Sequence, residues 1–451
     1  MTDHDQLHSE LRRLAETGQI EQFSTLAREV HPSDVADVLA TLDEDLRLKL
    51  VEALPPEIVS EALAEMEEEE HPEEILAAME PEAAADIVEE LQDDDAADLI
   101  ADLPEEAATR ILSEVETEER ADIERLLTYD EETAGGLMTT HVVAVPEETT
   151  AAGAIEEIRR QAEEVEDFYQ VFCVDDRHRL VGVLPVQRVV VAPPGELVRD
   201  IMEPPPVVAT PGLDQEEVAR LMSRYNVPSM PVVDPTGKLL GRVTFDDVID
   251  VVEAEQTEDL LMFGGGSADE LLAGEWYQAV RHRLPWLYLN LFTAFFAAAV
   301  VLMFEETVSQ LVILAAVMPV VAGLGGSAGT QALAVTVRRI ALGHIPKGTG
   351  IRLVGKEMLV GLVNGLAIGI VVGGVMIVMG RGWELGLVVT IAMWGSLMVA
   401  ATVGAAVPLL LERIGVDPAV ASSGFVTAVT DIAGFFLLLG MAAWFLLPGI
   451  S

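Results

Sequence analysis

The sequence has little cysteine, little lysine and few aromatic residues. Cys173 is the only cysteine among 451 residues, which excludes an intrachain disulfide and a cysteine-based metal site. The first residues, MTDHDQLHSELRRLAE, contain no apolar segment, so we expect no secretory signal peptide. We find no nucleophile–base pair, Walker loop or histidine-rich metal motif, and therefore expect that the protein is not an enzyme.

Positive charge is also scarce, with 27 Lys and Arg against 76 Asp and Glu. The excess of acid is confined to residues 1–275, which hold 18 basic and 69 acidic residues, whereas residues 276–451 hold 9 and 7. Such a surface repels phosphates, so nucleic acid is excluded as a partner and cations are favoured. Adaptation to a salty cytosol is an alternative explanation, because excess charge also keeps proteins soluble.

Long apolar runs are confined to the second part of the chain. A membrane-spanning helix needs ~20 mostly apolar residues. Five runs qualify: Pro285–Met303, Leu311–Val337, Met358–Met379, Leu385–Leu411 and Ala419–Leu447. Basic residues gather before the first run and in the links that follow the second and fourth runs. The positive-inside rule then predicts a multi-pass protein of the cell membrane, with its N-terminal half in the cytoplasm and its C-terminus outside.

The fifth run contains one ionisable residue, Asp431. A carboxylate at bilayer depth costs roughly 3 kcal/mol or more, so it indicates a functional site. Ser423, Thr427 and Asp431 recur at intervals of four residues, with Thr430 beside them, which predicts a polar stripe along one helix face. Counted from Ala419, Asp431 lies ~18 Å along the helix, near mid-bilayer. The alternative is a lone carboxyl group that is protonated or hydrogen-bonded to a neighbouring helix.

Two other runs are rich in glycine. The second run places Gln331 at membrane depth among closely spaced glycines, and packing alone does not explain this amide. The third run repeats glycine every four residues from Gly361 to Gly373, which predicts a helix-packing stripe. In a homodimer, two Asp431 side chains would face one pathway and attract a divalent cation. A wide stripe of hydroxyl groups suits Mg²⁺, which keeps its waters.

The acidic part begins with a repeat. Leu54-Pro55, Met79-Glu80-Pro81 and Leu103-Pro104 lie about two dozen residues apart. We interpret each unit as a short amphipathic helix closed by a proline or an acidic cap. Stacked units of this kind form a superhelix.

From Gly135 the pattern changes to alternating strands and helices in two copies. Val174-Asp175 matches Val233-Asp234 at an offset of 59, and Gly182 matches Gly241 at the same offset. The copies resemble a tandem pair of cystathionine-β-synthase (CBS) domains, which often bind adenine nucleotides. The nucleotide signature Thr-x-x-Asp occurs once, as Thr244 and Asp247, so ATP is a candidate ligand.

An acidic helix is predicted from Asp246 to Met262. It contains like-charged pairs at intervals of three or four residues, such as Asp246 with Asp250 and Glu255 with Asp259. Each pair destabilises a helix by ~0.2–0.5 kcal/mol, and a bound cation would reverse the sign. The helix is therefore a candidate switch between sensor and pore. A solvated acidic helix in a salty cytosol is the alternative.

The order of these parts resembles the MgtE family of magnesium channels and transporters over essentially the whole chain. The most specific matches are EETAGGLM (131–138), DQEEVARLM (214–222), DVIDVVEAEQTED (247–259), GLGGSAGTQ (323–331) and residues 417–434. The resemblance implies a homodimer in a lipid bilayer, with the pore at the subunit interface. It implies that Asp431 is the filter carboxylate for hydrated Mg²⁺. It also implies that cytosolic Mg²⁺ closes the pore.

The resemblance further implies which acidic side chains bind the regulatory cation. They are Glu61, Asp94, Asp98, Asp214, Glu216, Asp247, Asp250, Glu255, Glu258, Asp259 and Asp417. Two positions depart from the family pattern: Ser423 stands where the filter often has an amide, and Asn226 where an acid can occur. Ser423 leaves the choice among Mg²⁺, Mn²⁺ and Co²⁺ open.

The expected fold class is a multidomain α-helical membrane protein. We predict an all-α superhelix over 1–130, two α/β CBS domains over 131–195 and 196–248, a connecting helix over 249–275, and five transmembrane helices over 276–451. Two other functions remain open from the residues. One is a membrane-anchored cation or nucleotide sensor that transports nothing, and the other is a proton-coupled exporter of divalent cations that uses Asp431 as its proton carrier.

Overall fold

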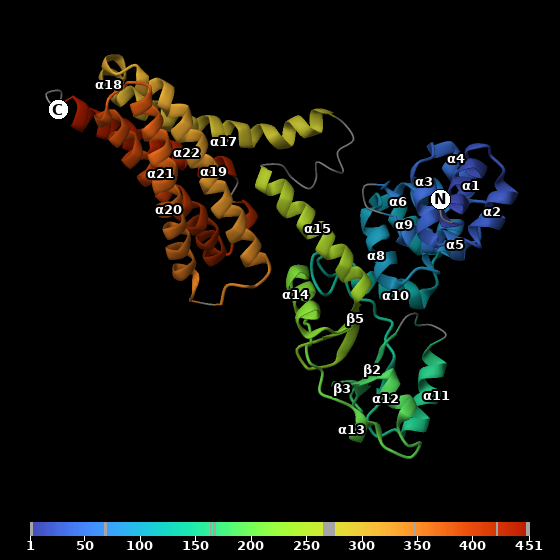
Figure 1. Cartoon of the computed structure of the whole chain (residues 1–451). Helices are drawn as coiled ribbons and strands as arrows, with labels where there is room; N and C mark the ends of the chain where they lie inside the picture. The colour runs from blue at the N-terminus through green and yellow to red at the C-terminus, as the bar shows by residue number, and fades with distance from the viewer. Residues whose placement is uncertain are drawn as a thin grey trace. The chain divides into compact units, whose positions relative to one another are not determined.

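The computed structural model describes residues 3–66, 70–162, 165, 168–264, 276–346, 348–420 and 423–447. The chain divides into two compact units, Met1–Glu253 and Ala254–Ser451. Helix α15 (Phe245–Gly264) runs from the first unit into the second (Figure 1). Helix α15 begins within one residue of the acidic helix predicted from Asp246, so the predicted domain boundary at 249 falls inside it, and residues 265–275 lie outside the described part.

Within its described residues, the first unit starts with ten short helices. They are α1 (Asp3–Glu16), α2 (Ile20–Ala27), α3 (Pro32–Ala40), α4 (Glu44–Val51), α5 (Pro56–Ala64), α6 (Pro72–Ala78), α7 (Pro81–Val88), α8 (Asp93–Asp102), α9 (Glu105–Glu114) and α10 (Thr117–Leu126). Helices two apart in the sequence pack together, so the odd-numbered helices form one row and the even-numbered helices another. The predicted superhelix is confirmed. Its core is apolar, with Phe23, Leu39 and Leu63 almost wholly buried.

Prolines mark where several of these helices begin. Pro32, Pro56, Pro72 and Pro81 each occupy the first helical position. A proline there sacrifices no hydrogen bond, because first-turn N–H groups have no intrahelical acceptor, and its fixed φ suits the helix. The expectation that proline closes each repeat unit was therefore wrong, since these prolines open the next helix.

Two small α/β modules follow the superhelix. In the first, β1 (Ala144–Pro146) pairs in parallel with β2 (Gln170–Val174), which pairs antiparallel with β3 (Leu180–Pro185). In the second, β4 (Ser229–Val233) pairs antiparallel with β5 (Leu239–Thr244). Helices α11 (Ala151–Gln161), α12 (Val186–Val191) and α13 (Val198–Ile201) belong with the first module, and α14 (Gln215–Tyr225) precedes β4.

The offset of 59 residues between the modules is visible in detail. The strand register shifts between Cys173 and Val174 in one module and between Val232 and Val233 in the other. The equivalent residues Gln170 and Ser229 meet, and the Gln170 side chain donates a hydrogen bond of 2.8 Å to the Ser229 carbonyl oxygen. The two copies therefore face each other through matching positions, as expected for a CBS pair.

The two modules exchange their leading segments. Met138, before β1 in the first copy, packs on Gly241 of β5 in the second, and Thr139 bridges to Arg242. Met202, before β4 in the second copy, packs on Gly182 of β3 in the first. A Cβ atom at Gly182 would lie 2.6 Å from the Met202 sulfur, so both matched glycines make room for a methionine from the other half. Each module thus depends on the other for its packing.

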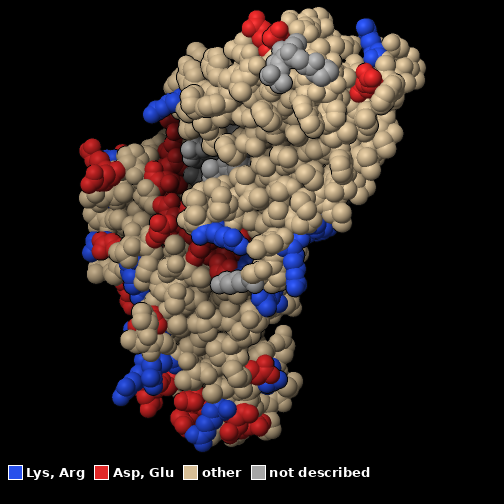
Figure 2. All heavy atoms as spheres, turned by 90° about the vertical axis from the view of Figure 1, so that its left-hand side faces the viewer, with Lys and Arg blue, Asp and Glu red and all other residues tan. Residues whose placement is uncertain are grey.

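The second unit contains five helices long and apolar enough to cross a membrane, within the residues described. They are α17 (Trp276–Met303), α19 (Ile313–Ala341), α20 (Gly350–Val378), α21 (Trp383–Ile414) and α22 (Ser423–Leu446), with the short α18 (Glu305–Gln310) after α17. On the face shown in Figure 2, a broad area carries few charged residues, in keeping with contact with lipid. The predicted five-helix membrane part and fold class are confirmed.

Glycines bring α20 and α21 into close contact. A Cβ atom at Gly361 would lie 2.6 Å from the Leu397 carbonyl oxygen, and one at Gly365 would lie 2.9 Å from the Trp394 carbonyl oxygen. The Trp394 indole N–H donates a 3.0 Å hydrogen bond to the Leu362 carbonyl oxygen on the facing helix. The predicted packing stripe in the third run is therefore confirmed.

Helix α22 begins later than its apolar run. A 3₁₀ turn (Pro418–Val420) precedes it, and the helix starts at Ser423. Asp431 therefore lies ~12 Å along the helix rather than ~18 Å, about a third of its length. Counting from the start of the apolar run overestimated the depth of Asp431 along the helix. The run also includes an apolar turn, which packs against α21 and does not belong to α22.

Candidate functional site

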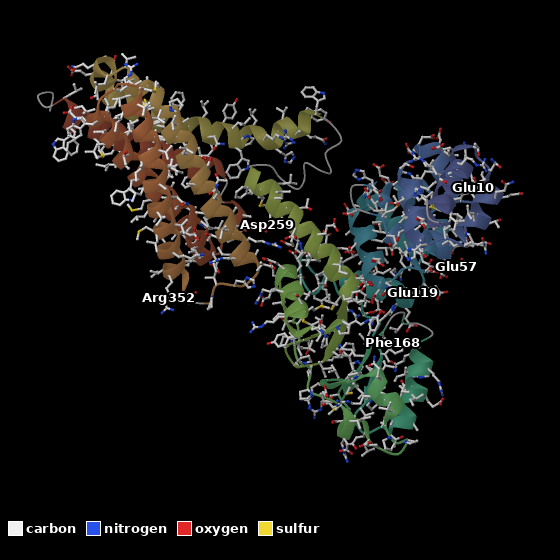
Figure 3. All side chains as sticks on the ribbon, in the orientation of Figure 1. Glu10, Glu57, Glu119, Phe168, Asp259 and Arg352 are labelled. Carbon is white, nitrogen blue, oxygen red and sulfur yellow. The ribbon has the colours of Figure 1, made fainter. Side chains whose placement is uncertain are left out.

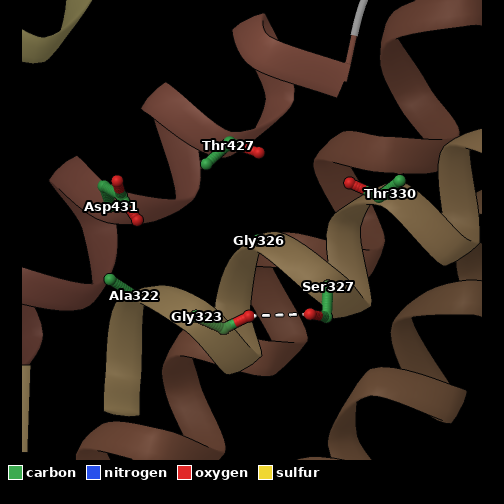
Figure 4. A pocket seen from close by; sticks show the side chains of 7 residues that line it. All are labelled: Ala322, Gly323, Gly326, Ser327, Thr330, Thr427 and Asp431. Atoms are coloured by element: carbon green, nitrogen blue, oxygen red, sulfur yellow. Dashed lines mark hydrogen bonds between the residues drawn. The ribbon is translucent and has the colours of Figure 1, made fainter. Parts of the chain in front are cut away.

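A cavity of ≈ 630 Å³ lies between α19 and α22 (Figure 4). Its lining consists of Ala322, Gly323, Gly326, Ser327 and Thr330 from α19 with Thr427 and Asp431 from α22. The lining combines small residues, hydroxyl groups and one carboxylate. It is a groove that carries several polar groups, between helices whose outer surfaces are apolar.

Asp431 is the single ionisable residue of this lining. Its Oδ1 atom is buried and has no hydrogen-bond partner among the described residues. A buried carboxylate oxygen without a partner costs more than the 1–3 kcal/mol of a neutral group. The arrangement therefore favours a ligand that brings positive charge or donates hydrogen bonds, and a hydrated cation does both.

Glycines on α19 shape the wall opposite Asp431. A Cβ atom at Gly326 would lie 3.3 Å from the Thr427 methyl group, and one at Gly329 would lie 2.7 Å from a Val426 methyl group. The two helices therefore approach closely along this line. The Ser327 hydroxyl donates a 2.8 Å hydrogen bond to the Gly323 carbonyl oxygen, so its own oxygen remains available as an acceptor toward the cavity (Figure 4).

The predicted pore residues differ in whether they line this cavity. Thr427 and Asp431 line the cavity, whereas Thr430 is buried and donates a 2.8 Å hydrogen bond to the Thr427 carbonyl oxygen. Gln331 is exposed and is not part of this lining, so its assignment to the pathway stays a prediction. The side chain of Ser423 lies outside the described part of the structure.

Two lining residues, Ser327 and Thr330, are polar residues of the second run that were not included among the predicted pore residues. Gly323, Ser327 and Thr330 lie at intervals of four and three residues, so they share one face of α19. That spacing was visible in the sequence. Gln331 is one position further along and therefore points about 100° away from Thr330.

A second candidate site lies in the first unit, where α8 meets the start of α15. Asp94 is buried, and its Oδ1 atom has no hydrogen-bond partner among the described residues. Burial and the charges of Asp95 and Asp247 raise the pKa of Asp94 well above its usual value. These three carboxyl groups therefore lie close enough in space to repel one another.

Neighbouring carboxyl groups show the same effect. Burial, followed by the charges of Asp247 and Asp246, raises the pKa of Asp95 to about 7. Burial raises the pKa of Asp247 to about 6, against the opposing hydrogen bonds from Thr244. Asp98 is exposed to solvent beside a small hollow. The surrounding protein nevertheless displaces part of its water, and this loss together with the charge of Asp95 raises the pKa of Asp98 to about 8.

Other predicted ligands of the first unit are placed differently. Glu61 is exposed, and it is Glu65, one turn later, whose charge acts on Asp95. Asp214 caps α14 by accepting a 3.0 Å hydrogen bond from the backbone N–H of Glu216, which is itself exposed.

Asp250 is the remaining predicted ligand of the first unit. Asp250 is exposed, and its charge contributes to the raised pKa of Asp247. No three acidic or histidine side chains of the described residues converge within metal-binding distance.

The second unit holds an acidic pair. Asp259 on α15, labelled in Figure 3, has a pKa raised by burial and by the charge of Asp417, and Arg338 partly offsets both. Asp417 accepts a 2.8 Å hydrogen bond from the Ala419 backbone N–H, which fixes the turn before α22. Glu255 and Glu258 lie half-buried on the same stretch of α15.

The end of α15 packs directly against the helices of the cavity. Met262 and Phe263 contact a cluster that includes Leu333 of α19 and Val426 of α22. Val426 is adjacent in sequence to the cavity residue Thr427. Asp259 therefore lies on a helix whose last residues pack against α19 and α22, the two helices that line the groove.

The two residues of the nucleotide signature are hydrogen-bonded to each other. The Thr244 hydroxyl and backbone N–H both donate to Asp247 Oδ2, the backbone bond measuring 3.2 Å. Asp247 therefore belongs to two candidate sites, the nucleotide signature and the acidic cluster with α8.

Comparisons with known proteins match each part of the chain. Residues 318–441 match the MgtE family described as divalent cation transporter, and residues 30–132 match the MgtE intracellular N domain. Residues 134–194 and 198–254 match the CBS domain.

Relatives match over nearly the full length. The magnesium transporter MgtE of Enterococcus faecalis is 37% identical over 99% of both chains, and that of Bacillus subtilis is 31% identical over 98% of both. Among solved structures, the soluble part of a magnesium transporter aligns with a TM-score of 0.52 and 32% identity over 56% of this chain and 99% of its own. The cytosolic domain of the Mg²⁺ channel MgtE in complex with ATP aligns with a TM-score of 0.51 and 35% identity over 54% of this chain and 99% of its own.

Proposed function

Since the chain belongs to the MgtE family of magnesium transporters, we propose that it is a homodimeric channel that carries Mg²⁺ through the cell membrane along the cavity between α19 and α22. The single observation that carries this proposal is the buried, unpartnered Oδ1 atom of Asp431 in a cavity otherwise lined by hydroxyl groups and small residues. The family is one of transporters, and the expectation that the protein is not an enzyme is confirmed.

The lining fits a hydrated ion better than a bare one. Mg²⁺ dehydrates reluctantly and prefers a few carboxylates with its waters retained. Ser327, Thr330 and Thr427 supply oxygens that accept hydrogen bonds from such waters, and Asp431 supplies the charge. A second subunit would add a second Asp431 and close the open side of the groove. Mn²⁺ and Co²⁺ have the same charge and are candidate substitutes.

We also propose that cytosolic Mg²⁺ closes the channel by binding to the acidic groups of the first unit and of α15. Asp94, Asp95 and Asp247 repel one another, and Asp94 Oδ1 lacks a partner among the described residues. A divalent cation would replace this repulsion by attraction and hold α8 against α15. Asp259 and Asp417 offer a second such position, next to the helices of the cavity.

The membrane protein has a cytosolic N-terminal half. The basic links between the membrane helices support a C-terminus outside the cell. ATP is a proposed ligand of the CBS pair, because the signature residues Thr244 and Asp247 are both present and a relative of 35% identity was solved with ATP.

The test of transport is Asp431→Asn in proteoliposomes with a Mg²⁺-sensitive dye inside. The amide keeps the shape of the side chain but removes the charge, so we expect Mg²⁺ influx to fall to background. Glu412→Gln is the matched control, because this exposed carboxylate at the end of α21 lies outside the lining. Unchanged influx in Asp431→Asn would remove the filter role, and no influx in the unaltered protein would favour a sensor that transports nothing.

Measuring flux with and without an imposed proton gradient distinguishes a channel from a proton-coupled exporter. Influx through a channel should follow the Mg²⁺ gradient at equal internal and external pH. Flux that instead follows an imposed pH difference would support the proton-coupled alternative.

A further inference from the structure

Helix α17 carries an amide where its neighbours are apolar or aromatic. Between Pro285 and Met303 the strongly polar side chains are those of Asn290 and Thr293. Thr293 is satisfied within the helix, since its hydroxyl donates a 3.0 Å hydrogen bond to the Asn290 carbonyl oxygen. Leaving an amide side chain in hydrocarbon without a partner costs several kcal/mol. Its position therefore calls for a specific explanation.

The Asn290 side chain lies on the backbone of Gly424, in the first turn of α22. A Cβ atom at Gly424 would lie 2.5 Å from Asn290 Oδ1 and 2.6 Å from Nδ2. Both polar atoms of the amide therefore occupy the space that any other residue at position 424 would fill. Helix α17 packs on α22, whereas Phe292 and Phe295 on the same helix are more than 60% exposed on the face that meets lipid. The amide points toward the bundle.

Helix geometry places this contact beside the cavity. Gly424 and Asp431 are seven residues apart, so they point in the same direction around α22 to within ~20° and lie ~10 Å apart along it. Thr427 lies between them and lines the cavity with Asp431. Asn290 therefore adds a polar group to the edge of the same face, at the end of α22 nearest its N-terminus.

We propose that Asn290 lines the cytosolic end of the ion pathway and accepts hydrogen bonds from the waters of the passing cation. This inference rests on the proposed transport of Mg²⁺. A neutral amide suits the position, because its oxygen replaces part of the outer hydration of the ion without adding a second charge that would hold it. The competing explanation is that Asn290 only joins α17 to α22, since polar side chains also hold membrane helices together.

Water access distinguishes the two explanations. Asn290→Cys is made in a Cys173→Ser background, although Cys173 is itself buried and burial raises the pKa of its thiol to about 12. A charged, membrane-impermeant thiosulfonate is applied to the cytosolic side in liposomes, and labelling is followed by mass. We expect the Asn290→Cys protein to be labelled at least about tenfold faster than the lipid-facing Phe292→Cys control, because only a thiol in water reacts as the thiolate. Mg²⁺ should slow this labelling.

Equally slow labelling of the two variants overturns the proposal. This readout does not depend on flux, so the proposal can fail while Asp431→Asn still abolishes transport. If the unaltered protein carries no Mg²⁺, fast labelling shows only that water reaches Asn290, and its role in an ion pathway is overturned together with the proposed function.

Flux supplies the second measurement. Asn290→Leu should lower Mg²⁺ influx about tenfold, as expected for loss of one charge-assisted hydrogen bond. Asn290→Gln should restore part of the influx, and Thr293→Val should leave it unchanged. A merely structural amide would give the opposite pattern: a lower unfolding temperature for Asn290→Leu, with unchanged influx per folded protein.

Discussion

Thr139 donates a hydrogen bond of 2.6 Å from its hydroxyl to the buried carboxylate of Asp93. The backbone N–H of Thr140 adds a bond of 3.0 Å to the same carboxylate. Asp93 thereby ties α8 of the superhelix to the segment that packs on β5 of the second CBS module. The next residue, Asp94, is equally buried but leaves Oδ1 without a partner among the described residues. Two adjacent carboxylates on one helix thus have different roles.

This difference predicts opposite effects of the same chemical change. Asp93→Asn should destabilise the first unit by roughly 1.5–3 kcal/mol, because it weakens charge-assisted hydrogen bonds. Asp94→Asn should stabilise it at neutral pH in the presence of a chelator, because the raised pKa of Asp94 means that folding must either bury its charge or take up a proton. Thermal unfolding of the purified protein in EDTA measures both. Equal shifts of the same sign would contradict the assignment.

The pH dependence of stability has a predicted sign. The pKa values of Asp95, Asp98 and Asp247 are raised to about 7, 8 and 6 in the folded chain, so the folded state holds protons that the unfolded chain has already released. The free energy of unfolding should therefore be highest near pH 4 and fall as pH rises toward 8 when Mg²⁺ is absent. Saturating Mg²⁺ should reduce this fall, because the cation takes the place of the protons.

Urea unfolding at several pH values, with and without Mg²⁺, tests this prediction. The triple variant Asp95→Asn, Asp98→Asn, Asp247→Asn is the control and should show a flatter profile. A stability that rises with pH between 5 and 8 in EDTA would rule out the proposed repulsion.

Adjacent glycines on α20 offer a matched pair. A Cβ atom at Gly373 would collide with the Gly386 carbonyl oxygen and the Thr390 hydroxyl of α21, whereas one at Gly374 would meet open space. Gly373→Ala should therefore lower stability by about 1–3 kcal/mol through overpacking. Gly374→Ala should be neutral or should stabilise the helix by up to about 1 kcal/mol. Unfolding temperatures in lipid nanodiscs compare the two, and similar losses for both would contradict the packing stripe.

Ser396 of α21 gives a further prediction. Its side chain is buried against Gly325 of α19 and Gly434 of α22, and its hydroxyl has no partner among the described residues. Ser396→Ala should therefore keep or raise stability, since removing an unpaired buried hydroxyl relieves its desolvation cost of about 1–3 kcal/mol. Thr402→Val on the same helix is the contrasting control, because it removes a 2.7 Å hydrogen bond to the Met398 carbonyl oxygen. A clear loss of stability in Ser396→Ala would reveal a hydrogen bond that forms in another state of the protein.

The candidate site was predictable to the extent that it depends on single helices. Asp431 and Thr427 were recognised because a polar stripe in an apolar run is a local property of sequence. Gln331 was assigned to the pathway and Ser327 was not, because the direction in which α19 faces α22 depends on how the helices pack. Glu61 was predicted from the family resemblance alone, and the charge of Glu65, just after α5, on Asp95 depends on how the short helices pack.

The chain's composition alone established the five membrane helices, the acidic half in the cytosol and the buried carboxylate. These follow from the transfer of local segments between water and lipid, which depends on neighbouring residues in the sequence. The exchange of Met138 and Met202 between the CBS modules, the different roles of Asp93 and Asp94, and the contact of Asn290 with Gly424 emerged only in three dimensions. The methionine exchange and the Asn290 contact join residues far apart in the chain, whereas Asp93 and Asp94 are adjacent but have different surroundings. In all three cases the packing of helices and strands decides which atoms meet.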